Sequence, residues 1–322
     1  MRLALIALTL LSGFAVPMRA DAQDFPTKPI RIIVPWAPGG NVDITARTIA
    51  PGLGEALGTS IIVENKPGAG GTLGTVQVAK AAPDGYTLTL GSTAAVTISP
   101  SVYKGVEYDP VKDLTAIGAI NNSALVLTAA PKFPVSNYKE FLAEATRRSG
   151  KLSVGTPGIG STNHLTIALI ENLAGIKVLH VPYKGAGPAL NDLLANQLDM
   201  MVDQLPPSMP HIREGRIKAI AVTSLKRVGE LPDVPTFAEL GLPNFQANTF
   251  TGLFGPAGLP PPVLDKLSAA LQKVLAQPAV RERFLATGVE MLDMSRAEFA
   301  LFVKADFEKW LTVVQAAGIT AE

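Results

Sequence analysis

The 322-residue sequence contains no cysteine and only three histidines, His164, His180 and His211. The lack of cysteine excludes disulfide bonds, a thiolate nucleophile, cysteine metal ligands and lipid attachment at a cysteine after an export signal. No two histidines have the HExxH spacing of a zinc-binding helix. The sequence therefore predicts no metal site and no cofactor.

Charge is also scarce: 17% of the residues are charged, and 28 Lys and Arg against 27 Asp and Glu leave the chain nearly neutral. There is no basic stripe of the kind that nucleic acid binding requires. A hydrophobic content of 47% is typical of a globular chain rather than a disordered one. We therefore expect a globular protein that binds no nucleic acid.

The longest apolar run lies at the N-terminus, where Arg2 precedes Leu3 to Val16 and the small-x-small pattern Ala20-Asp21-Ala22 follows. This arrangement is typical of a removed export signal, and the run is short of the roughly 20 apolar residues of a membrane span. We interpret residues 1–22 as a signal peptide and expect the protein in the periplasm. The mature chain of about 300 residues exceeds what one hydrophobic core usually organises, so two lobes are expected.

The stretch from Val34 to Asp43, Val-Pro-Trp-Ala-Pro-Gly-Gly-Asn-Val-Asp, follows an apolar run that predicts a buried strand and precedes a helical pattern. At the start of such a helix, unpaired backbone N–H groups and the positive end of the helix dipole favour an anion. Gly39 and Gly40 let a ligand approach the main chain. The stretch therefore predicts either an anion site or a plain tight turn.

Side chains in and after this stretch have expected roles. Asn41 or Asp43 would cap the helix, and Trp36 would place a flat apolar face beside the same opening, as a lid or as core packing. Further along the helix, Pro51 removes a backbone hydrogen bond, so we expect a kink there.

Other polar loops follow predicted strands. Gly91-Ser92-Thr93 follows the strand 86–90, a glycine-rich loop at 155–162 follows the strand 152–154, and the strand 198–202 ends at Asp203. None of the glycine clusters has the GxGxxG, P-loop or GxSxG spacing. Backbone N–H groups and hydroxyls suit the reversible capture of a carboxylate, and the sequence shows no activated nucleophile or tuned acid–base pair.

Strands and helices alternate along the chain, which predicts an α/β fold. A longer apolar stretch at 117–128 and a strand at 249–254 predict two crossings between lobes. Lobe 1 is then residues 23–124 with 246–322, and lobe 2 is the inserted residues 125–245, each a central sheet flanked by helices. Because ligands bind at the carboxyl ends of strands in such sheets, the loops at Pro38, Ser92, Ser161 and Asp203 should face one cleft.

Several motifs carry a resemblance to a known family: Pro-Trp-Ala-Pro-Gly-Gly-x-x-Asp at 35–43, Val63 to Gly71, Ala82 to Leu88, Tyr108-Asp109-Pro110 and Val181 to Gly185. With these motifs, essentially the whole mature chain resembles the Bug family, the extracytoplasmic solute-binding receptors of tripartite tricarboxylate transporters. The resemblance implies a two-lobed, type II periplasmic-binding-protein (Venus flytrap) fold. It also implies a carboxylate-bearing solute held by main-chain amides, hydroxyls and ordered water, and the membrane components of such a transporter as partners.

Carried onto this sequence, the resemblance implies a set of ligand-binding residues: Trp36, Pro38, Gly39, Gly40, Asn41 and Asp43 in the first loop, Gly91, Ser92 and Thr93 in the second, and Ser161, Thr162, His164 and Asp203 in the facing lobe. Asp43 and Asp203 would repel a bare anion, so we expect each to orient a loop or a water, or to meet an amino or hydroxyl group of the ligand. We expect His164 to donate at a helix start rather than act as a base.

The sequence therefore predicts a monomeric, non-catalytic receptor for a small organic acid, which closes by a hinge near residues 124 and 246. Mono-, di- and tricarboxylates, amino acids and aromatic acids all fit a site built on backbone donors. Two alternatives remain open. One is a ligand-sensing partner of a membrane signalling protein, and the other is a secreted hydrolase or isomerase, which would need a base near a nucleophile.

Overall fold

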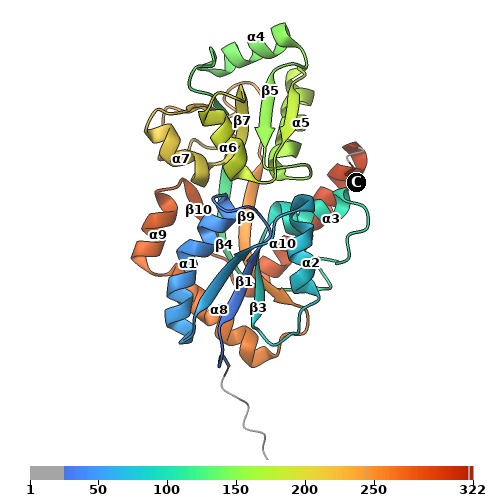
Figure 1. The fold of residues 1–322 in the computed structure, drawn as a ribbon, viewed down its shortest axis with the longest axis vertical. Helices are drawn as coiled ribbons and strands as arrows, with labels where there is room; N and C mark the ends of the chain where they lie inside the picture. Colours follow the sequence, from blue (N-terminus) through green and yellow to red (C-terminus); the bar gives the residue numbers. More distant parts are fainter. Residues whose placement is uncertain (1–24, 244, 318–319, 322) are drawn as a thin grey trace, which may run out of the picture.

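The computed structural model describes residues 25–243, 245–317 and 320–321. The expected signal peptide, residues 1–22, lies outside the described residues. The described chain forms two lobes, one above the other in Figure 1, which are joined by the long strands β4 (Leu114–Ala129) and β9 (Asn248–Pro256).

The lower lobe in Figure 1 holds the first and the last elements of the chain. In chain order it begins with β1 (Ile30–Val34), α1 (Asn41–Leu57), β2 (Ile61–Asn65), η1 (Ala69–Gly71), α2 (Thr72–Ala79), β3 (Thr87–Ser92), η2 (Thr93–Ile98) and α3 (Ser99–Val102). After β9 the chain continues in this lobe with α8 (Pro261–Leu275), α9 (Pro278–Leu285), β10 (Val289–Met291) and α10 (Arg296–Ala317).

The upper lobe contains the elements between the two long strands. They are α4 (Tyr138–Arg148), β5 (Ser153–Thr156), α5 (Thr162–Ala174), β6 (Leu179–Pro182), α6 (Ala186–Leu194), β7 (Met200–Gln204), α7 (Leu205–Arg213) and β8 (Lys218–Val222).

The strand order is β2-β1-β3-β9-β4-β7-β5-β6, and β8 and β10 also pair with β4. Residues Leu114 to Ala124 of β4 pair with β9, whereas Leu125 to Ala129 pair with β7. The strand therefore changes partners between Ala124 and Leu125, so that one half of β4 belongs to the sheet of each lobe.

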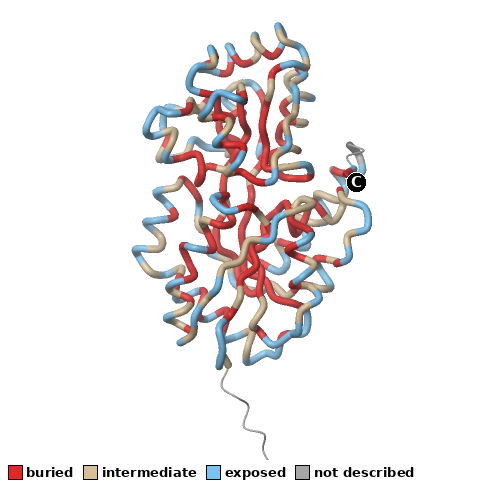
Figure 2. The backbone as a smooth tube through the Cα atoms, in the orientation of Figure 1, coloured by how far each residue is buried: buried red, intermediate tan, exposed pale blue. Residues whose placement is uncertain are grey.

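Each lobe buries side chains on both faces of its sheet, because neighbouring strand residues point to opposite faces. In the lower lobe, Leu253 clusters with residues of α1 and α8, while Phe254 clusters with residues of η2 and α10. In the upper lobe, Val202 clusters with residues of α4 and α5, while Met201 clusters with residues of α6. Buried residues thus follow the strands of both lobes and continue through the level at which the lobes meet (Figure 2).

Most of the expected elements are present. The start of α10 has the geometry of a capping box, since the Ser295 N–H donates to Glu298 Oε2 at 2.8 Å and the Glu298 N–H donates to Ser295 Oγ at 3.2 Å. Pro51, at which we expect a kink, lies inside α1, which continues as one helix from Asn41 to Leu57.

Two local expectations are wrong. Gly40 is the N-cap of α1, and no side chain caps this helix, so neither Asn41 nor Asp43 has that role. Gly91-Ser92-Thr93 is not a loop, because β3 continues to Ser92 and η2 begins at Thr93. The reason is tertiary: β9 pairs with β3 as far as Ser92, opposite Thr251, and this long-range pairing extends the strand beyond its local pattern.

Candidate functional site

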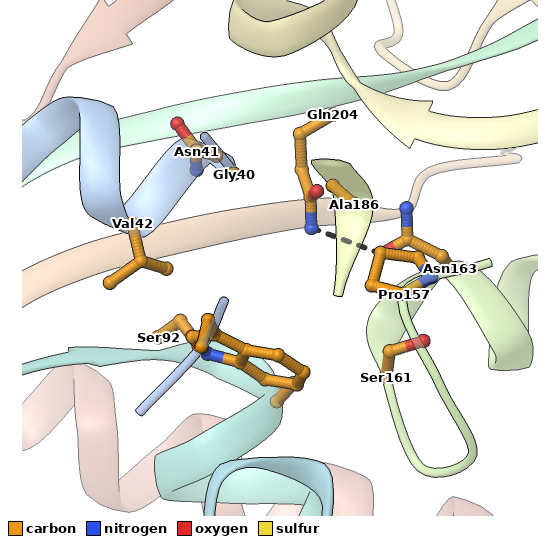
Figure 3. Close-up of a pocket in the computed structure, with 11 residues that line it drawn as sticks. Gly40, Asn41, Val42, Ser92, Pro157, Ser161, Asn163, Ala186 and Gln204 are labelled. Atoms are coloured by element: carbon orange, nitrogen blue, oxygen red, sulfur yellow. Dashed lines mark hydrogen bonds between the residues drawn. The ribbon is translucent and has the colours of Figure 1, made fainter. Parts of the chain in front are cut away.

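A cavity lies between the two lobes and is lined by residues of both (Figure 3). It encloses about 350 Å³ of space, its opening included. We call it the inner cavity. Its lining residues come from both lobes: Trp36, Gly40, Asn41, Val42, Ser92 and Ala94 from the lower lobe, and Pro157, Ser161, Asn163, Ala186 and Gln204 from the upper lobe. No titratable side chain is among these lining residues.

The lining residues gather at the N-terminal ends of five of the described helices, α1, η2, α5, α6 and α7. Gly40 is the N-cap of α1, Ser92 of η2, Ser161 of α5 and Gln204 of α7, while Ala186 is the first residue of α6. The first backbone N–H groups of a helix have no partner within the helix, and the helix dipole is positive at this end. The inner cavity is therefore an electropositive site without a fixed cation.

The lower-lobe wall holds a hydroxyl whose hydrogen is available. Ser92 Oγ accepts a hydrogen bond from Trp36 Nε1 at 3.2 Å and one from the Ala95 N–H at 3.5 Å. A hydroxyl oxygen has two acceptor lone pairs and one hydrogen. Since both lone pairs are engaged, Ser92 is left with a donor for a ligand.

Asn41 lines the same cavity and is buried, with 2% of its surface exposed, and neither its Oδ1 nor its Nδ2 has a hydrogen-bond partner. Buried polar groups in folded proteins are nearly always paired, and an unpaired one costs about 1 to 3 kcal/mol. A ligand that accepts from Asn41 Nδ2 would pair one of the two groups and remove part of this cost. Asn41 is therefore the strongest candidate for a direct ligand contact.

The upper-lobe wall is bonded within itself. Gln204 Nε2 donates to Asn163 Oδ1 at 3.0 Å, and Asn163 Nδ2 donates to the Val202 carbonyl at 2.8 Å. Ser161 Oγ donates to the Gly158 carbonyl at 2.6 Å and accepts from the His164 N–H at 3.2 Å, which caps α5. Figure 3 shows Gln204 and Asn163 joined across this wall.

The two lobes touch beside the inner cavity. A Cβ added to Gly185, which has a φ of +127°, would lie 2.5 Å from the Cβ of Ala37 in the lower lobe. The Gly40 backbone likewise faces Ala186, whose Cβ lies 3.7 Å from the position of an added Cβ. These contacts mark the closed arrangement of the lobes, and only glycine fits at residue 185.

Asp43 does not line the inner cavity but holds the loop that does. Its carboxylate accepts from the Gly39 N–H at 2.9 Å, from Asn65 Nδ2 at 2.9 Å and from Arg47 Nε at 3.0 Å. Burial alone would raise the pKa of Asp43, but the hydrogen bonds from Arg47, Gly39 and Asn65 outweigh it and hold the pKa below its usual value. Arg47 offsets the negative charge that would otherwise oppose an anion nearby.

Asp203 is completely buried in β7, next to Gln204. Its Oδ2 accepts from Ser208 Oγ at 2.8 Å, and its Oδ1 has no partner. Burial raises the pKa of Asp203 to about 7. At or below neutral pH a large fraction of this carboxyl is uncharged, so its repulsion of an anion is reduced.

His164 lies behind the upper-lobe wall, with its ring stacked on His180 at a centroid distance of 4.2 Å. Its Nδ1 is 3.4 Å from the Gly160 nitrogen, and His180 Nε2 is 2.7 Å from Thr156 Oγ1. Burial lowers the pKa of His164 and, with the neighbouring His164 ring, lowers that of His180 to about 4. Both rings are therefore neutral near pH 7 and support the loop between β5 and α5.

The structure brings five of the thirteen predicted site residues to the inner cavity: Trp36, Gly40, Asn41, Ser92 and Ser161. The other eight are not among its lining residues: Pro38, Gly39, Asp43, Gly91, Thr93, Thr162, His164 and Asp203. All four segments expected to face one cleft reach the inner cavity: Ser92 and Ser161 line it themselves, Trp36 and Gly40 line it on either side of Pro38, and Gln204 lines it next to Asp203.

Six lining residues were missed by reasoning from the sequence: Val42, Ala94, Pro157, Asn163, Ala186 and Gln204. Asn163 and Gln204 could have been predicted, because each is an amide at the start of a helix that follows a strand. Val42, Ala94 and Ala186 carry none, since they contribute apolar surface and backbone.

Within the described residues, His, Asp and Glu side chains nowhere gather in threes as a metal site would require. In the same part of the chain, no helix combines the length and apolar character needed to cross a membrane.

A model of the tripartite tricarboxylate transporter family receptor matches residues 45–319. The chain is 37% identical over 315 residues to the UPF0065 protein in the tcbD-tcbE intergenic region of Pseudomonas sp. strain P51, a match that covers 97% of this chain and 92% of the relative. It is 34% identical over 308 residues to protein BugT of Bordetella pertussis, a match that covers 95% of this chain and 94% of the relative.

Solved structures are similar over the same extent. The periplasmic binding protein BugD is 39% identical with a TM-score of 0.88, over 92% of this chain and 100% of BugD. MatC of Rhodopseudomonas palustris with bound malate is 36% identical with a TM-score of 0.85, over 90% and 100%. R. palustris Rpa4515 with adipate is 31% identical with a TM-score of 0.88, over 92% and 99%. The predicted two-lobed α/β fold is thereby confirmed.

Proposed function

Since the chain belongs to the tripartite tricarboxylate transporter receptor family, the Bug family of periplasmic solute-binding proteins, we propose that it captures a small carboxylate-bearing solute between its lobes. We further propose that it acts in the periplasm and delivers this solute to the membrane components of a tripartite tricarboxylate-type transporter.

One observation carries the proposal: five helix N-termini meet at a cavity whose lining has no titratable side chain. Each helix N-terminus stabilises an anion by about 0.3 to 1 kcal/mol, and more when the site is partly buried. Hydrogen bonds to a charged acceptor contribute roughly 1.5 to 3 kcal/mol each. A carboxylate is thus held firmly without a permanent ion pair, as reversible capture and release require.

Two solved relatives support the ligand class. MatC contains malate and Rpa4515 contains adipate, and both are small organic acids. In this chain, Ser92 and Asn41 on one wall and the backbone N–H groups of α5 and α6 on the other would bind such an acid from opposite sides. We propose the same residues, with Trp36, Gly40, Ser161 and Gln204, as the ligand-binding set.

The pairing of β4 supports a division into residues 23–124 with 246–322 and residues 125–245. Its partner changes between Ala124 and Leu125, and β9 begins at Asn248. A small rotation of these two strands would separate Ala37 from Gly185 and open the inner cavity. We propose these crossings as the hinge.

The chemistry at the cavity supports binding rather than catalysis. The Ser161 hydroxyl donates to the Gly158 carbonyl, and the His164 ring faces the Gly160 N–H. A serine nucleophile needs a base that accepts its hydrogen, and this serine gives its hydrogen to a carbonyl instead. The geometry around Ser161 and its neighbour His164 therefore agrees with a receptor.

The test is a thermal-shift screen of the mature protein against a panel of organic acids, followed by recovery of the bound acid. A ligand at 100 times its dissociation constant adds about 2.7 kcal/mol to the free energy of unfolding. We expect at least one small carboxylate to raise the melting temperature and to be recovered chemically unchanged. A panel in which every carboxylate leaves the melting temperature unchanged, or a hit recovered as a product, would overturn the proposal.

A further inference from the structure

Tyr103 joins the two lobes without lining the inner cavity. It follows α3 in the lower lobe, and its hydroxyl donates to the Ile159 carbonyl of the upper lobe at 2.8 Å. Its ring lies 2.6 Å from the position of a Cβ added to Gly70 in the lower lobe and 2.9 Å from one added to Gly160 in the upper lobe. A side chain at either glycine would displace the ring. The backbone of both lobes is therefore fitted to this tyrosine.

The segment that Tyr103 contacts in the upper lobe belongs to the wall of the inner cavity. Ile159 lies between Pro157 and Ser161, and both of these residues line the cavity. Ser161 is also the N-cap of α5. The Ile159 side chain is 39% exposed, so it does not anchor this loop in the core of the upper lobe. The hydrogen bond from Tyr103 therefore fixes where the loop lies relative to the lower lobe.

An apolar cluster beside Tyr103 also crosses between the lobes. Leu165 of α5 is 6% exposed and is the upper-lobe member of this cluster among the described residues. The lower lobe contributes the other members: Ile98, Val102, Tyr103, Trp310, Val314 and Ala321. Moving the lobes apart would separate Leu165 from all of these side chains. Because burial of apolar surface is favourable, this contact stabilises the closed arrangement.

Residue 321 holds the backbone on both sides of Tyr103. The Ala321 N–H donates to the Val102 carbonyl at 2.8 Å, and the Lys104 N–H donates to the Ala321 carbonyl at 3.3 Å. Figure 1 shows the end of α10 beside α3, at the level where the two lobes meet. The lower lobe thus positions Tyr103 before the upper lobe reaches it, and a group that is already ordered loses little conformational freedom when it forms its contact.

We propose that Tyr103 and Leu165 form an interlobe latch, which holds the loop of residues 157–161 and the start of α5 over the bound solute and so sets how long the solute stays bound. Tyr103 is a positioning residue, since it acts on the inner cavity through this loop. The inference rests on the proposed function, because a residence time requires a solute between the lobes. The latch should therefore change the rate of dissociation and not the rate of association.

The test is a stopped-flow measurement of both rates, with the organic acid that raises the melting temperature most in the screen above. Tyr103→Phe removes only the hydroxyl that reaches Ile159. We expect dissociation to become about three- to tenfold faster, while the association rate stays within about twofold. The melting temperature without acid should not change, since the open lobes do not make this bond. Tyr138→Phe is the matched control, because its buried hydroxyl has no partner among the described residues, and it should change neither rate.

Leu165→Ala should have a larger effect on the same rate. It removes three carbons from the interlobe cluster, and each buried methylene contributes about fourfold to an equilibrium constant. We expect dissociation to become at least about tenfold faster. Leu173→Ala is the matched control on the same helix, because Leu173 is 48% exposed, and it should leave both rates unchanged.

A second measurement follows the separation of the lobes directly. The chain has no cysteine, so a pair of introduced cysteines can be labelled specifically. Leu73→Cys on α2 and Leu179→Cys on β6 place labels on exposed residues of the two lobes. Energy transfer between these labels reports closure with or without an acid. Adding Tyr103→Phe or Leu165→Ala should increase the fraction of open molecules, whereas Tyr138→Phe and Leu173→Ala should not.

The outcomes separate the latch from the receptor proposal. Dissociation rates in Tyr103→Phe and Leu165→Ala equal to those of their controls would overturn the latch and leave the receptor proposal standing. A lower melting temperature without acid, together with unchanged dissociation, would also overturn the latch, since both residues would then support only the fold. If no acid binds, the receptor proposal fails, and unchanged energy transfer in both variants would overturn the latch as well.

Discussion

The two lobes differ in whether the polar groups that line the inner cavity already have hydrogen-bond partners. On the lower wall, both amide atoms of Asn41 lack a partner and the hydrogen of the Ser92 hydroxyl is available. On the upper wall, Gln204, Asn163 and Ser161 already donate to groups of their own lobe. The lower lobe is therefore prepared for the ligand at a cost in stability, while the upper lobe is a preassembled wall that closes over it.

A substitution at the contact between the lobes should have the largest effect on ligand affinity. Gly185→Ala would place a Cβ 2.5 Å from that of Ala37, and residue 185 has a φ of +127° that side chains rarely adopt. The closed arrangement should become inaccessible without any change to a polar group of either wall. We expect the affinity for the best acid to fall by at least about a hundredfold, or about 2.7 kcal/mol, in isothermal titration.

The control for this variant is Gly175→Ala at the end of α5. Gly175 also has a positive φ, of +65°, but a Cβ there would meet open space. This control should lose some thermal stability through backbone strain and keep its affinity. Equal affinity in Gly185→Ala and the unaltered protein would show that binding does not require the closed arrangement.

Replacing one buried amide in each wall tests the difference between the walls. Asn41→Leu removes a buried amide without partners, so the affinity should fall by about 10- to 100-fold while the ligand-free melting temperature stays the same or rises. Asn163→Leu breaks bonds to Val202 and Gln204, so it should lower the ligand-free melting temperature. A loss of stability in Asn41→Leu equal to that in Asn163→Leu would contradict the asymmetry.

The buried carboxyl behind the upper wall gives a smaller effect that depends on pH. Because burial raises the pKa of Asp203 to about 7, the folded protein keeps a proton that the unfolded chain releases near pH 4. The free energy of unfolding therefore falls as the pH rises from about 4 through 7. Asp203→Asn lacks this titration, so its stability relative to the unaltered protein should rise by about 1.4 kcal/mol between pH 6 and pH 8.

Denaturant unfolding of both proteins at several pH values measures this difference. His180 has its pKa lowered to about 4, which makes stability rise with pH between about 4 and 6.5, opposite to Asp203. The subtraction removes that contribution, because both proteins retain His180. A difference that stays constant from pH 5 to pH 8 would mean that Asp203 is charged throughout this range.

The sequence predicts the strand–loop–helix around residues 34–43 well, because its apolar run, glycines and helix start are all local signals. It fails at Gly91 to Thr93, where pairing with Thr251, far along the chain, extends β3. It also assigns Asp43 the wrong role. The Asp43 carboxylate accepts from Gly39, Arg47 and Asn65 instead of capping the helix, and the contact with Asn65 depends on where β2 lies. The lining residues Val42, Ala94 and Ala186 contribute backbone and small apolar surface, which no side-chain motif marks.

The smallest expected effect comes from His164, which supports the upper wall without lining the inner cavity. His164→Ala removes the stacking on His180 and the contact with Gly160 but leaves the Ser161 cap of α5 in place. We expect the melting temperature to fall and the affinity to change by less than about threefold. Isothermal titration of His164→Ala and Asn41→Leu with the same acid compares the contribution of each wall to the affinity. A loss of tenfold or more in His164→Ala would mean that the loop of residues 157–161 positions the ligand directly, and that the upper lobe does more than close over a site formed by the lower one.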